Sequence, residues 1–354
     1  MRYLRVVRIS NKQDMLSILI FSKDDTEKAI DTIHEVYDFA DEIIVVDQSS
    51  SKNKNLLLSE KRKKHLIKLK VVNALPLGYV GPLFRYGENK CLCKWILMLD
   101  TDEKPNEFFK NNIRKELETS KAQGLNVYFK SKDAQKGISY DEYRLKIYQK
   151  GTMEYDGILH QIPSINGKVQ DLNPSFVLFH DFNYVNNEKK LERYFKIEAF
   201  TNRITYKDVL DLMQKRSMNS SVLKLYFRLK GVKNELELTK FDYIILQTLY
   251  MFLVYLLEFP RQSFKSTMFT IWYNNKKFDY FFSSNPAERQ NQLEISREIK
   301  KNKGVINYLG FNNDAVVDNL YEKFKNKVKN PTDFFVCLLK ERKQKGKNYY
   351  QYIS

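Results

Sequence analysis

Two carboxylates stand one residue apart directly after an apolar stretch of the chain. Residues 95–99 read Trp-Ile-Leu-Met-Leu, and Asp100 and Asp102 follow at once. In extended backbone, side chains two residues apart project to the same side. Carboxylate oxygens at the carboxyl end of a strand are suitable ligands for a divalent cation that also binds a diphosphate. The spacing therefore predicts a site for a metal-bound nucleotide, although an acid here can also do no more than cap the next helix.

A second apolar stretch ends in an acid in the same way. Residues 42–46 read Glu-Ile-Ile-Val-Val, Asp47 follows, and residues 48–51 are Gln-Ser-Ser-Ser. A polar side chain that follows a buried strand lies at the edge of the sheet, where open α/β sheets bind ligands. The two junctions together indicate a nucleotide-binding α/β domain.

Strands and helices alternate around these junctions. We expect strands at 16–21, 42–46, 66–72 and 95–99. We expect helices at about 26–37, 83–93 and 106–122, the last with Phe108, Ile113 and Leu117 directed inward. Three later strands are expected at 125–130, 143–149 and 175–179, and the chain is expected to be mainly helical from residue 187 onward. The alternation predicts a mostly parallel sheet with helices on both faces.

The composition is that of a globular, basic protein. The chain has 354 residues, of which 43% are hydrophobic and 29% are charged, and its net charge is +17. Such a charge favours a polyanionic partner, either nucleic acid or an anionic membrane surface, unless it reflects only a lysine-rich solvated surface. Three cysteines without zinc-ligand spacing and the lack of a secretory signal at the start predict a cytoplasmic location.

One segment in the second half of the chain is strongly apolar. Residues 243–257 contain almost no polar side chain, but 15 residues are fewer than the roughly 20 that a membrane-spanning helix needs. Basic and aromatic residues follow at 261–282. We therefore favour a helix that lies in a membrane interface or is buried in a helical domain over one that crosses the bilayer.

Five segments, taken in chain order, resemble one enzyme family. Residues 17–25, 41–51, 95–103, 157–161 and 178–194 are similar to the sequence motifs of family 2 glycosyltransferases with the GT-A fold. The similarity is to the branch that contains enzymes of lipopolysaccharide-core, capsule and protein glycosylation. This resemblance implies an inverting transferase that moves a sugar from a nucleotide-sugar donor, most plausibly a UDP-sugar, to a glycan or lipid-linked acceptor.

The resemblance also implies a division of the chain and a membrane location. It covers about residues 15–205, so we expect a GT-A catalytic domain at 1–215. A basic, aromatic helical region is expected at 216–354. The expected location is cytoplasmic, peripheral to the inner face of the cell membrane.

The resemblance assigns roles around the donor. Asp102 becomes the direct ligand of Mn²⁺ or Mg²⁺, Asp100 binds donor hydroxyls and the waters of the metal, and Asp47 accepts hydrogen bonds from the base or ribose. The other expected donor-binding residues are Ser22, Asp24, Ser49, Arg85 and Lys90.

The residues on the acceptor side are less clearly defined by the motifs. His160 and His180 are expected to close the site, one of them as a third metal ligand or a hydrogen-bond donor to the diphosphate, and we assign His180 to the metal. The base is expected to be Asp156 or Asp181, with a slight preference for Asp156.

The chain also departs from the family pattern. Gln161 stands where the family has a glutamate, and the first turn contains Asp24 and Asp25 in place of Asn-Glu. These departures leave open a catalytically degenerate scaffold. A nucleic-acid-binding protein is a further alternative, which is disfavoured because the sequence shows no nucleic-acid-binding motif.

Overall fold

The computed structural model describes most of the first half of the chain and the C-terminal helices. The described residues are 15–49, 57–61, 64, 66–133, 139–159, 164–182, 188–201, 282–325 and 327–349, with a few single positions between 210 and 249. The expected domain boundary at 215–216 and nearly all of the apolar run at 243–257 lie outside these residues.

The chain divides into two compact units. The first consists of residues 1–186, 309–331 and 347–354, and the second consists of residues 187–308 and 332–346. Each unit is described by itself below.

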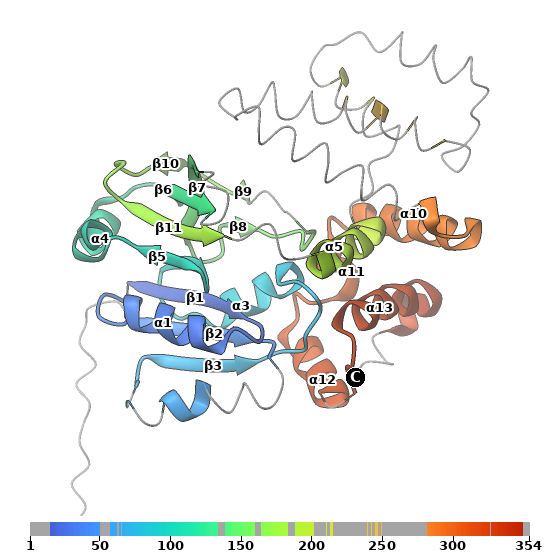
Figure 1. The fold of residues 1–354 in the computed structure, drawn as a ribbon, viewed down its shortest axis with the longest axis horizontal. Coiled ribbons are helices and arrows are strands. Elements are labelled where there is room, and N and C mark those ends of the chain that lie inside the picture. The colour runs from blue at the N-terminus through green and yellow to red at the C-terminus, as the bar shows by residue number, and fades with distance from the viewer. Residues whose placement is uncertain are drawn as a thin grey trace, which may run out of the picture. The chain divides into compact units, whose positions relative to one another are not determined.

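A nine-stranded mixed sheet forms the centre of the first unit (Figure 1). Its main path runs β3-β2-β1-β4-β7-β6-β11-β5, and β10 pairs with β6. The strands are β1 Leu16–Ser22, β2 Glu42–Asp47, β3 Leu69–Asn73, β4 Trp95–Asp100, β5 Glu103–Pro105, β6 Gly124–Asp133, β7 Ser139–Gln149, β10 Val169–Asp171 and β11 Val177–Phe182. β8 Met153–Glu154 and β9 Ser164–Ile165 form a separate two-stranded sheet.

The sheet is parallel from β3 through β4, and its remaining pairings are mixed. β1 pairs in parallel with both β2 and β4, β2 pairs in parallel with β3, and β6 does so with β10 and β11. Antiparallel pairs join β7 to β4 and β6, and β5 to β11. The expectation of an α/β fold with a mostly parallel sheet, followed by helices, is confirmed.

Helices cover both faces of the parallel strands, which explains why these strands are apolar throughout. The helices of the first unit include α1 Thr26–Val36, α3 Phe84–Lys90, α4 Glu107–Thr119 and α12 Asp314–Phe324, with the 3₁₀ turn η1 Gly81–Leu83. Ala29 and Ile33 of α1 share one buried cluster with Phe109 of α4. On the other face, Gly87 of α3 lies close to the side chains of Leu19 and Val46. Strands buried on both sides need apolar residues at every position.

Two details of the predicted elements were wrong. Phe108 is 44% exposed, and Phe109 takes the inward position in α4 together with Ile113 and Leu117. The strand expected at 175–179 continues through His180 to Phe182, so that His180 lies within the strand. The first difference concerns the phase of a helix. The second concerns the end of a strand, which pairing with β6 extends to Phe182.

The second unit is helical in the part of the chain that is described. Its helices are α5 Glu188–Thr201, α10 Pro286–Lys301, α11 Val305–Leu309 and α13 Pro331–Lys345, and the 3₁₀ turn η4 Gly346–Asn348 follows α13. α5 and α10 pack against one another. No helix within the described residues is both long enough and apolar enough to cross a membrane.

Candidate active site

The carboxyl ends of four parallel strands bring polar residues to one edge of the sheet. Ser22 of β1 lies opposite Asp47 of β2, and Asp47 lies opposite Asn73 of β3. On the other side of β1, Phe21 is paired with Asp100 of β4. This edge is where open α/β sheets bind nucleotides, and three of the residues predicted from the sequence meet here.

Hydrogen bonds tie the loops at this edge to one another. The fully buried Asp47 accepts a hydrogen bond at Oδ1 from the backbone N–H of Ser49 (2.9 Å), and Ser49 Oγ accepts one from the backbone N–H of Asp24 (2.7 Å). Asp24 has a φ of +58°, in the left-handed region. Asp, like Asn, enters this region more readily than most residues. The predicted residues Asp24, Asp47 and Ser49 therefore form one bonded group.

Three buried polar atoms near this group lack a hydrogen-bond partner among the described residues. They are Ser22 Oγ, Gln48 Nε2 and Asn73 Oδ1, and the side chains of Ser22 and Gln48 are almost fully buried. Gln48 is otherwise anchored, because its Oε1 accepts a hydrogen bond from the backbone N–H of Leu77 (3.1 Å). A buried polar group without a partner costs about 1–3 kcal/mol. These atoms therefore suit a bound molecule that both donates and accepts hydrogen bonds, and neither Gln48 nor Asn73 was predicted from the sequence.

Asp100 and Asp102 lie at the other end of this edge. Asp100 ends β4 with its side chain 58% exposed, and Asp102 follows in a turn whose Thr101 carbonyl accepts a hydrogen bond from Thr32 Oγ1 (3.0 Å). Asp102 Oδ2 lies 3.7 Å from His180 Nε2. Burial alone would raise the pKa of Asp102, but the neighbouring imidazole of His180, with smaller contributions from the backbone and Lys28, outweighs burial and holds that pKa below its usual range. Asp102 is thus kept ionised and acceptor-only.

His180 reaches Asp102 from β11 and is oriented by its second ring nitrogen. His180 Nδ1 lies 3.3 Å from Ser131 Oγ of β6, and the imidazole packs against the ring of Phe129. β6 and β11 are parallel neighbours, with Ser131 opposite His180. The predicted association of His180 with the acidic pair is therefore geometrically possible, and the fold brings the two together from residues far apart in the sequence.

A buried ion pair directly behind the acidic motif was not predicted. Glu103, which is 1% exposed, binds Lys146 Nζ of β7 with both carboxylate oxygens (2.6 and 2.7 Å) and accepts the backbone N–H of Asp100 (3.1 Å). Burial raises the pKa of Glu103 to about 7, against the opposing charge of Lys146. Lys146 Nζ also lies 3.9 Å from Asp100 Oδ2.

The donor set fits a divalent cation that is completed by phosphate oxygens. Within the described ranges, no three His, Cys, Asp or Glu side chains gather closely enough to form a ready-made metal cage. Asp102 and His180 stand close together, and Asp100 is open to solvent. Mg²⁺ in particular is usually held by one or two carboxylates together with substrate phosphates and water. Asp100 and Asp102, with His180 beside them, would hold such an ion.

The segment after β8 lies against the loop that follows β3. Tyr79 donates a hydrogen bond to the Gly157 carbonyl (2.7 Å), and Phe84 packs between Phe21 and Tyr155. This contact brings the neighbouring Asp156 toward the edge that carries the site. Burial raises the pKa of Asp156 above its usual range, and its Oδ1 accepts the backbone N–H of Ile158 (2.8 Å). A raised pKa suits a carboxylate that must accept a proton near neutral pH.

Arg85 and Lys90 are both engaged in other contacts. The Arg85 guanidinium donates to Glu88 Oε2 (2.7 Å) and to the Met153 carbonyl (2.8 Å) and lies over the ring of Tyr155. Lys90 forms an ion pair with Asp314 of α12 (2.8 Å). Lys90 ends α3, just before β4 begins, and therefore lies toward the sheet edge opposite Asp100. The structure does not bring Lys90 to the other predicted residues.

Two predicted acceptor-side residues have no described side chain. His160 lies outside the described residues, and Asp181 is described only as a backbone position on β11, next to His180. Their expected roles stay predictions.

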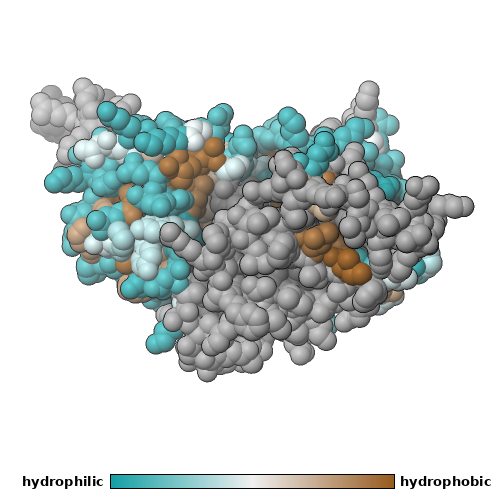
Figure 2. Space-filling view, turned by 90° about the horizontal axis from the view of Figure 1, so that it is seen from above, coloured by the Kyte–Doolittle hydropathy of each residue, from teal (hydrophilic) through white to brown (hydrophobic). Residues whose placement is uncertain are grey.

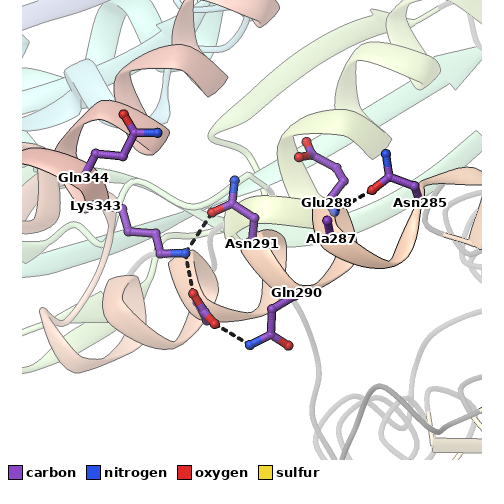
Figure 3. Close-up of a pocket in the computed structure, with 8 residues that line it drawn as sticks. Asn285, Ala287, Glu288, Gln290, Asn291, Lys343 and Gln344 are labelled. Atoms are coloured by element: carbon purple, nitrogen blue, oxygen red, sulfur yellow. Dashed lines mark hydrogen bonds and ion pairs between the residues drawn. The ribbon is translucent and has the colours of Figure 1, made fainter.

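The second unit contains a pocket whose polar side chains bind one another (Figure 3). It has a volume of about 520 Å³ and lies between α10 and α13. Its side chains bind one another: Lys343 Nζ contacts Asn291 Oδ1 (2.9 Å) and the carboxylate of Glu294, which also binds Gln290. Because these polar groups are already mutually satisfied, the pocket offers little to a ligand.

Among the residues that the structure describes, the exposed large apolar side chains are scattered. Figure 2 shows mostly hydrophilic residues among the coloured atoms of one face, with a few hydrophobic patches. The exposed large hydrophobic residues are Ile67, Leu92, Phe108, Val169 and Phe179. Single exposed residues of this kind are normal for soluble domains.

Comparison with known proteins points to glycosyltransferases. No family model matches the sequence. An uncharacterised glycosyltransferase from Rickettsia conorii is 31% identical over 100 residues, which are 28% of this chain and 33% of that protein. Another from Rickettsia bellii is 34% identical over 98 residues, which are 28% of this chain and 31% of that protein. The matched segment thus spans about a third of the length of these relatives.

Several solved structures overlap loosely with this chain. Staphylococcus aureus TarS 1–349 has a TM-score of 0.41 at 11% identity, covering 96% of this chain and 92% of that one. GalNAc-T7, solved with UDP, GalNAc and Mn²⁺, has a TM-score of 0.41 at 13% identity, covering 64% and 56%. The mannosyltransferase PcManGT from Pyrobaculum calidifontis, solved with GDP-Man and Mn²⁺, has a TM-score of 0.40 at 11% identity, covering 53% and 63%.

The Rickettsia relatives agree with the resemblance that the motifs indicate. The structure brings the strand ends of three of those motifs, at Ser22, Asp47 and Asp100, to one edge of an α/β sheet, as a nucleotide site requires. This chain resembles the glycosyltransferases with a GT-A-like fold.

Proposed function

We propose that this protein is a glycosyltransferase that moves a sugar from a nucleotide-sugar donor to a glycan or lipid-linked acceptor. The observation that carries the proposal is the coincidence of two features on one sheet edge. Buried polar atoms of Ser22, Gln48 and Asn73, which lack a hydrogen-bond partner among the described residues, suit a nucleoside, and the acidic pair Asp100 and Asp102 suits a metal-bound diphosphate. The 31% and 34% identities to glycosyltransferases support the same class.

The reaction proposed is a direct displacement that inverts the anomeric carbon. The acceptor hydroxyl attacks that carbon, its proton passes to a base, and the bond to the nucleoside diphosphate breaks. Asp102 and Asp100 would hold a divalent cation, which would supply Lewis-acid stabilisation of negative charge on the leaving phosphate. Asp47 and its bonded loop hold the base or ribose, and Asp100 also orients donor hydroxyls.

We assign the base to Asp156 rather than Asp181. Burial raises the pKa of Asp156, and its segment packs against the loop after β3 on the donor side. A base with a raised pKa transfers a proton more effectively near neutral pH than an ordinary aspartate does. His180, which lies beside Asp102, would help to hold the cation.

The proposal also covers the donor class, the acceptor and the location of the enzyme. A UDP-sugar is the donor class that the motifs favour, and the net charge of +17 supports an anionic acceptor or membrane surface. We therefore place the enzyme in the cytoplasm, peripheral to the inner face of the cell membrane.

A thermal-shift panel tests the proposal. The full chain is melted with each of a set of UDP- and GDP-sugars, with and without Mn²⁺. A donor at 100 times its dissociation constant stabilises the folded state by about 2.7 kcal/mol. We expect one donor to raise the melting temperature only when metal is present, and Asp102→Ala to lose both this shift and sugar transfer while keeping its circular dichroism spectrum.

The matched control is Glu107→Ala, which removes an exposed carboxylate near the same motif. This variant should respond to the donor as the wild type does. A panel without any donor-specific shift, or an Asp102→Ala protein with full transferase activity, would contradict the proposal.

A further inference from the structure

Lys146 lies between two carboxylates of very different exposure. Its Nζ is 2.6 and 2.7 Å from the oxygens of Glu103, whose side chain is 1% exposed. The same Nζ is 3.9 Å from Oδ2 of Asp100, whose side chain is 58% exposed. The Lys146 side chain is only 9% exposed, so its ammonium takes its partners from the protein more than from water.

Glu103 also fixes the backbone of the motif. Its Oε2 accepts a hydrogen bond from the Asp100 N–H (3.1 Å), and its own strand, β5, pairs with β11 so that Glu103 lies opposite His180. One buried carboxylate thus holds Lys146 and Asp100 at the same time. A glutamine at this position loses the negative charge that attracts the Lys146 ammonium, and one of the two atoms that now accept from Nζ becomes an amide N–H₂ donor.

A lysine beside a metal-binding carboxylate competes with the metal for that carboxylate. The attraction between unit charges rises steeply at short distance and low dielectric. Among the described residues, Asp100 is the other acid paired with Lys146, so an ammonium released by Glu103 would move the short distance toward Asp100. Groups that orient metal ligands from behind typically affect metal affinity by about 10–100-fold.

We infer that Glu103 is a positioning residue that retains the Lys146 ammonium and so keeps Asp100 available for the cation and the donor. The inference rests on the proposed function, because it concerns the same acidic pair. It differs from a purely structural role in one measurable way: removing Lys146 should correct the damage that is caused by removing Glu103.

The test is a double-mutant cycle on the full chain. Glu103→Gln, Lys146→Met and the double variant are titrated with Mn²⁺ in the presence of UDP at pH 8, and free Mn²⁺ is followed by electron paramagnetic resonance. Glu107→Gln, which alters an exposed glutamate at the start of α4, is the matched control. Circular dichroism and melting curves establish the folded fraction of each protein.

We expect Glu103→Gln to bind Mn²⁺ at least about tenfold more weakly than the wild type. The double variant, which has no competing ammonium, should return to within about threefold of the wild type, a non-additivity that contacting residues show. Glu107→Gln should bind Mn²⁺ as the wild type does.

Three results would overturn the inference. Unchanged Mn²⁺ affinity in folded Glu103→Gln would show that Glu103 does not keep Asp100 available by retaining the Lys146 ammonium. A double variant as weak as Glu103→Gln, or weaker, would show that the pair only shapes the fold. A wild type whose Mn²⁺ binding is absent, or is unaffected by Asp102→Ala, would remove the proposed metal site and this inference with it, whereas the first two results leave the proposed function standing.

Discussion

The buried Glu103 gives the first unit a pH-dependent stability whose sign can be worked out. Burial raises the pKa of Glu103 from 4.5 to about 7 in the folded chain. A carboxyl that binds its proton more tightly when folded contributes stability that is fully present below pH 4.5. This contribution is lost as pH rises to about 7. At about 1.4 kcal/mol per unit of pKa, the loss is about 3 kcal/mol.

The substitution that isolates this contribution of Glu103 to the free energy of unfolding is Glu103→Gln, which mimics the protonated side chain at every pH. We expect the two proteins to have similar free energies of unfolding at pH 4.5. Above pH 7 the glutamine variant should be the more stable by up to about 3 kcal/mol, because the raised pKa means that burying the Glu103 carboxylate costs more than the attraction of Lys146 contributes. Other carboxylates that titrate in this range contribute equally to both proteins and cancel in the difference.

Urea unfolding from pH 4.5 to 8, followed by tryptophan fluorescence, measures this difference. The chain has two tryptophans, and a Trp272→Phe background leaves the emission of Trp95, which is buried in the core of the first unit. A wild type that becomes the more stable protein as pH rises would refute the reasoning. That result would mean that the attraction of Lys146 outweighs the burial of Glu103.

Three further predictions test the site and the core. Asp156→Asn should reduce turnover at least about 100-fold while UDP binding, measured by calorimetry, stays unchanged, since loss of a general base removes a contribution of that size; weaker UDP binding would argue for a donor-side role. Phe109→Ala should lower the free energy of unfolding by about 3–5 kcal/mol, and Phe108→Ala by no more than about 1 kcal/mol, because the first ring is buried and the second is 44% exposed. Equal losses in the two would contradict the observed phase of α4. Gly87→Ala should cost about 1–3 kcal/mol in a thermal melt, because its new methyl carbon would lie 3.0 Å from side chains of β1; a neutral outcome would show that the strands yield at no cost.

The parts of the site that follow directly from buried strands could be predicted from the sequence. Asp47 and Asp100 each end an apolar run, and apolar runs of this length are typical of parallel strands with helices on both faces. Parallel register then places Ser22, Asp47 and Asp100 at the same edge without further information. For these three residues the apolar pattern in the sequence and the strand order in the structure lead to the same prediction.

The phase of α4 was predicted wrongly, although the local spacing contains the information needed to predict it. Phe108 and Phe109 are equally apolar, and successive residues of a helix differ by about 100° in direction. The side chain of Asn106 caps the helix by accepting the Phe109 N–H (2.9 Å), and the inward stripe runs from Phe109 through Ile113 to Leu117. These positions are four residues apart. Spacing alone would have favoured Phe109, because Phe108 and Ile113 are five apart and cannot share a narrow stripe.

The ion pair of Glu103 and Lys146 could not be found from the sequence because its members are 43 residues apart. Lys146 alternates with apolar neighbours in β7, as a solvent-facing lysine of an ordinary strand would. Only the antiparallel pairing of β7 with β4 brings it behind the acidic motif. Asn73 was not predicted for a similar reason. Its place in the site follows from its register with Asp47 and not from its neighbours in the chain.

The energetics of this pair give a reason to connect it with function. Replacing a buried ion pair by less polar groups often stabilises a protein, so such a pair is weak evidence for stability. Here the raised pKa of Glu103 indicates that the charged pair is costly near neutral pH. Lys146 points its ammonium at the acids on which the proposed metal site depends. If Glu103→Gln is more stable than the wild type above pH 7 and also binds Mn²⁺ more weakly, the same substitution will separate stability from function. A variant that is both more stable and undiminished in Mn²⁺ affinity would show that the pair serves neither.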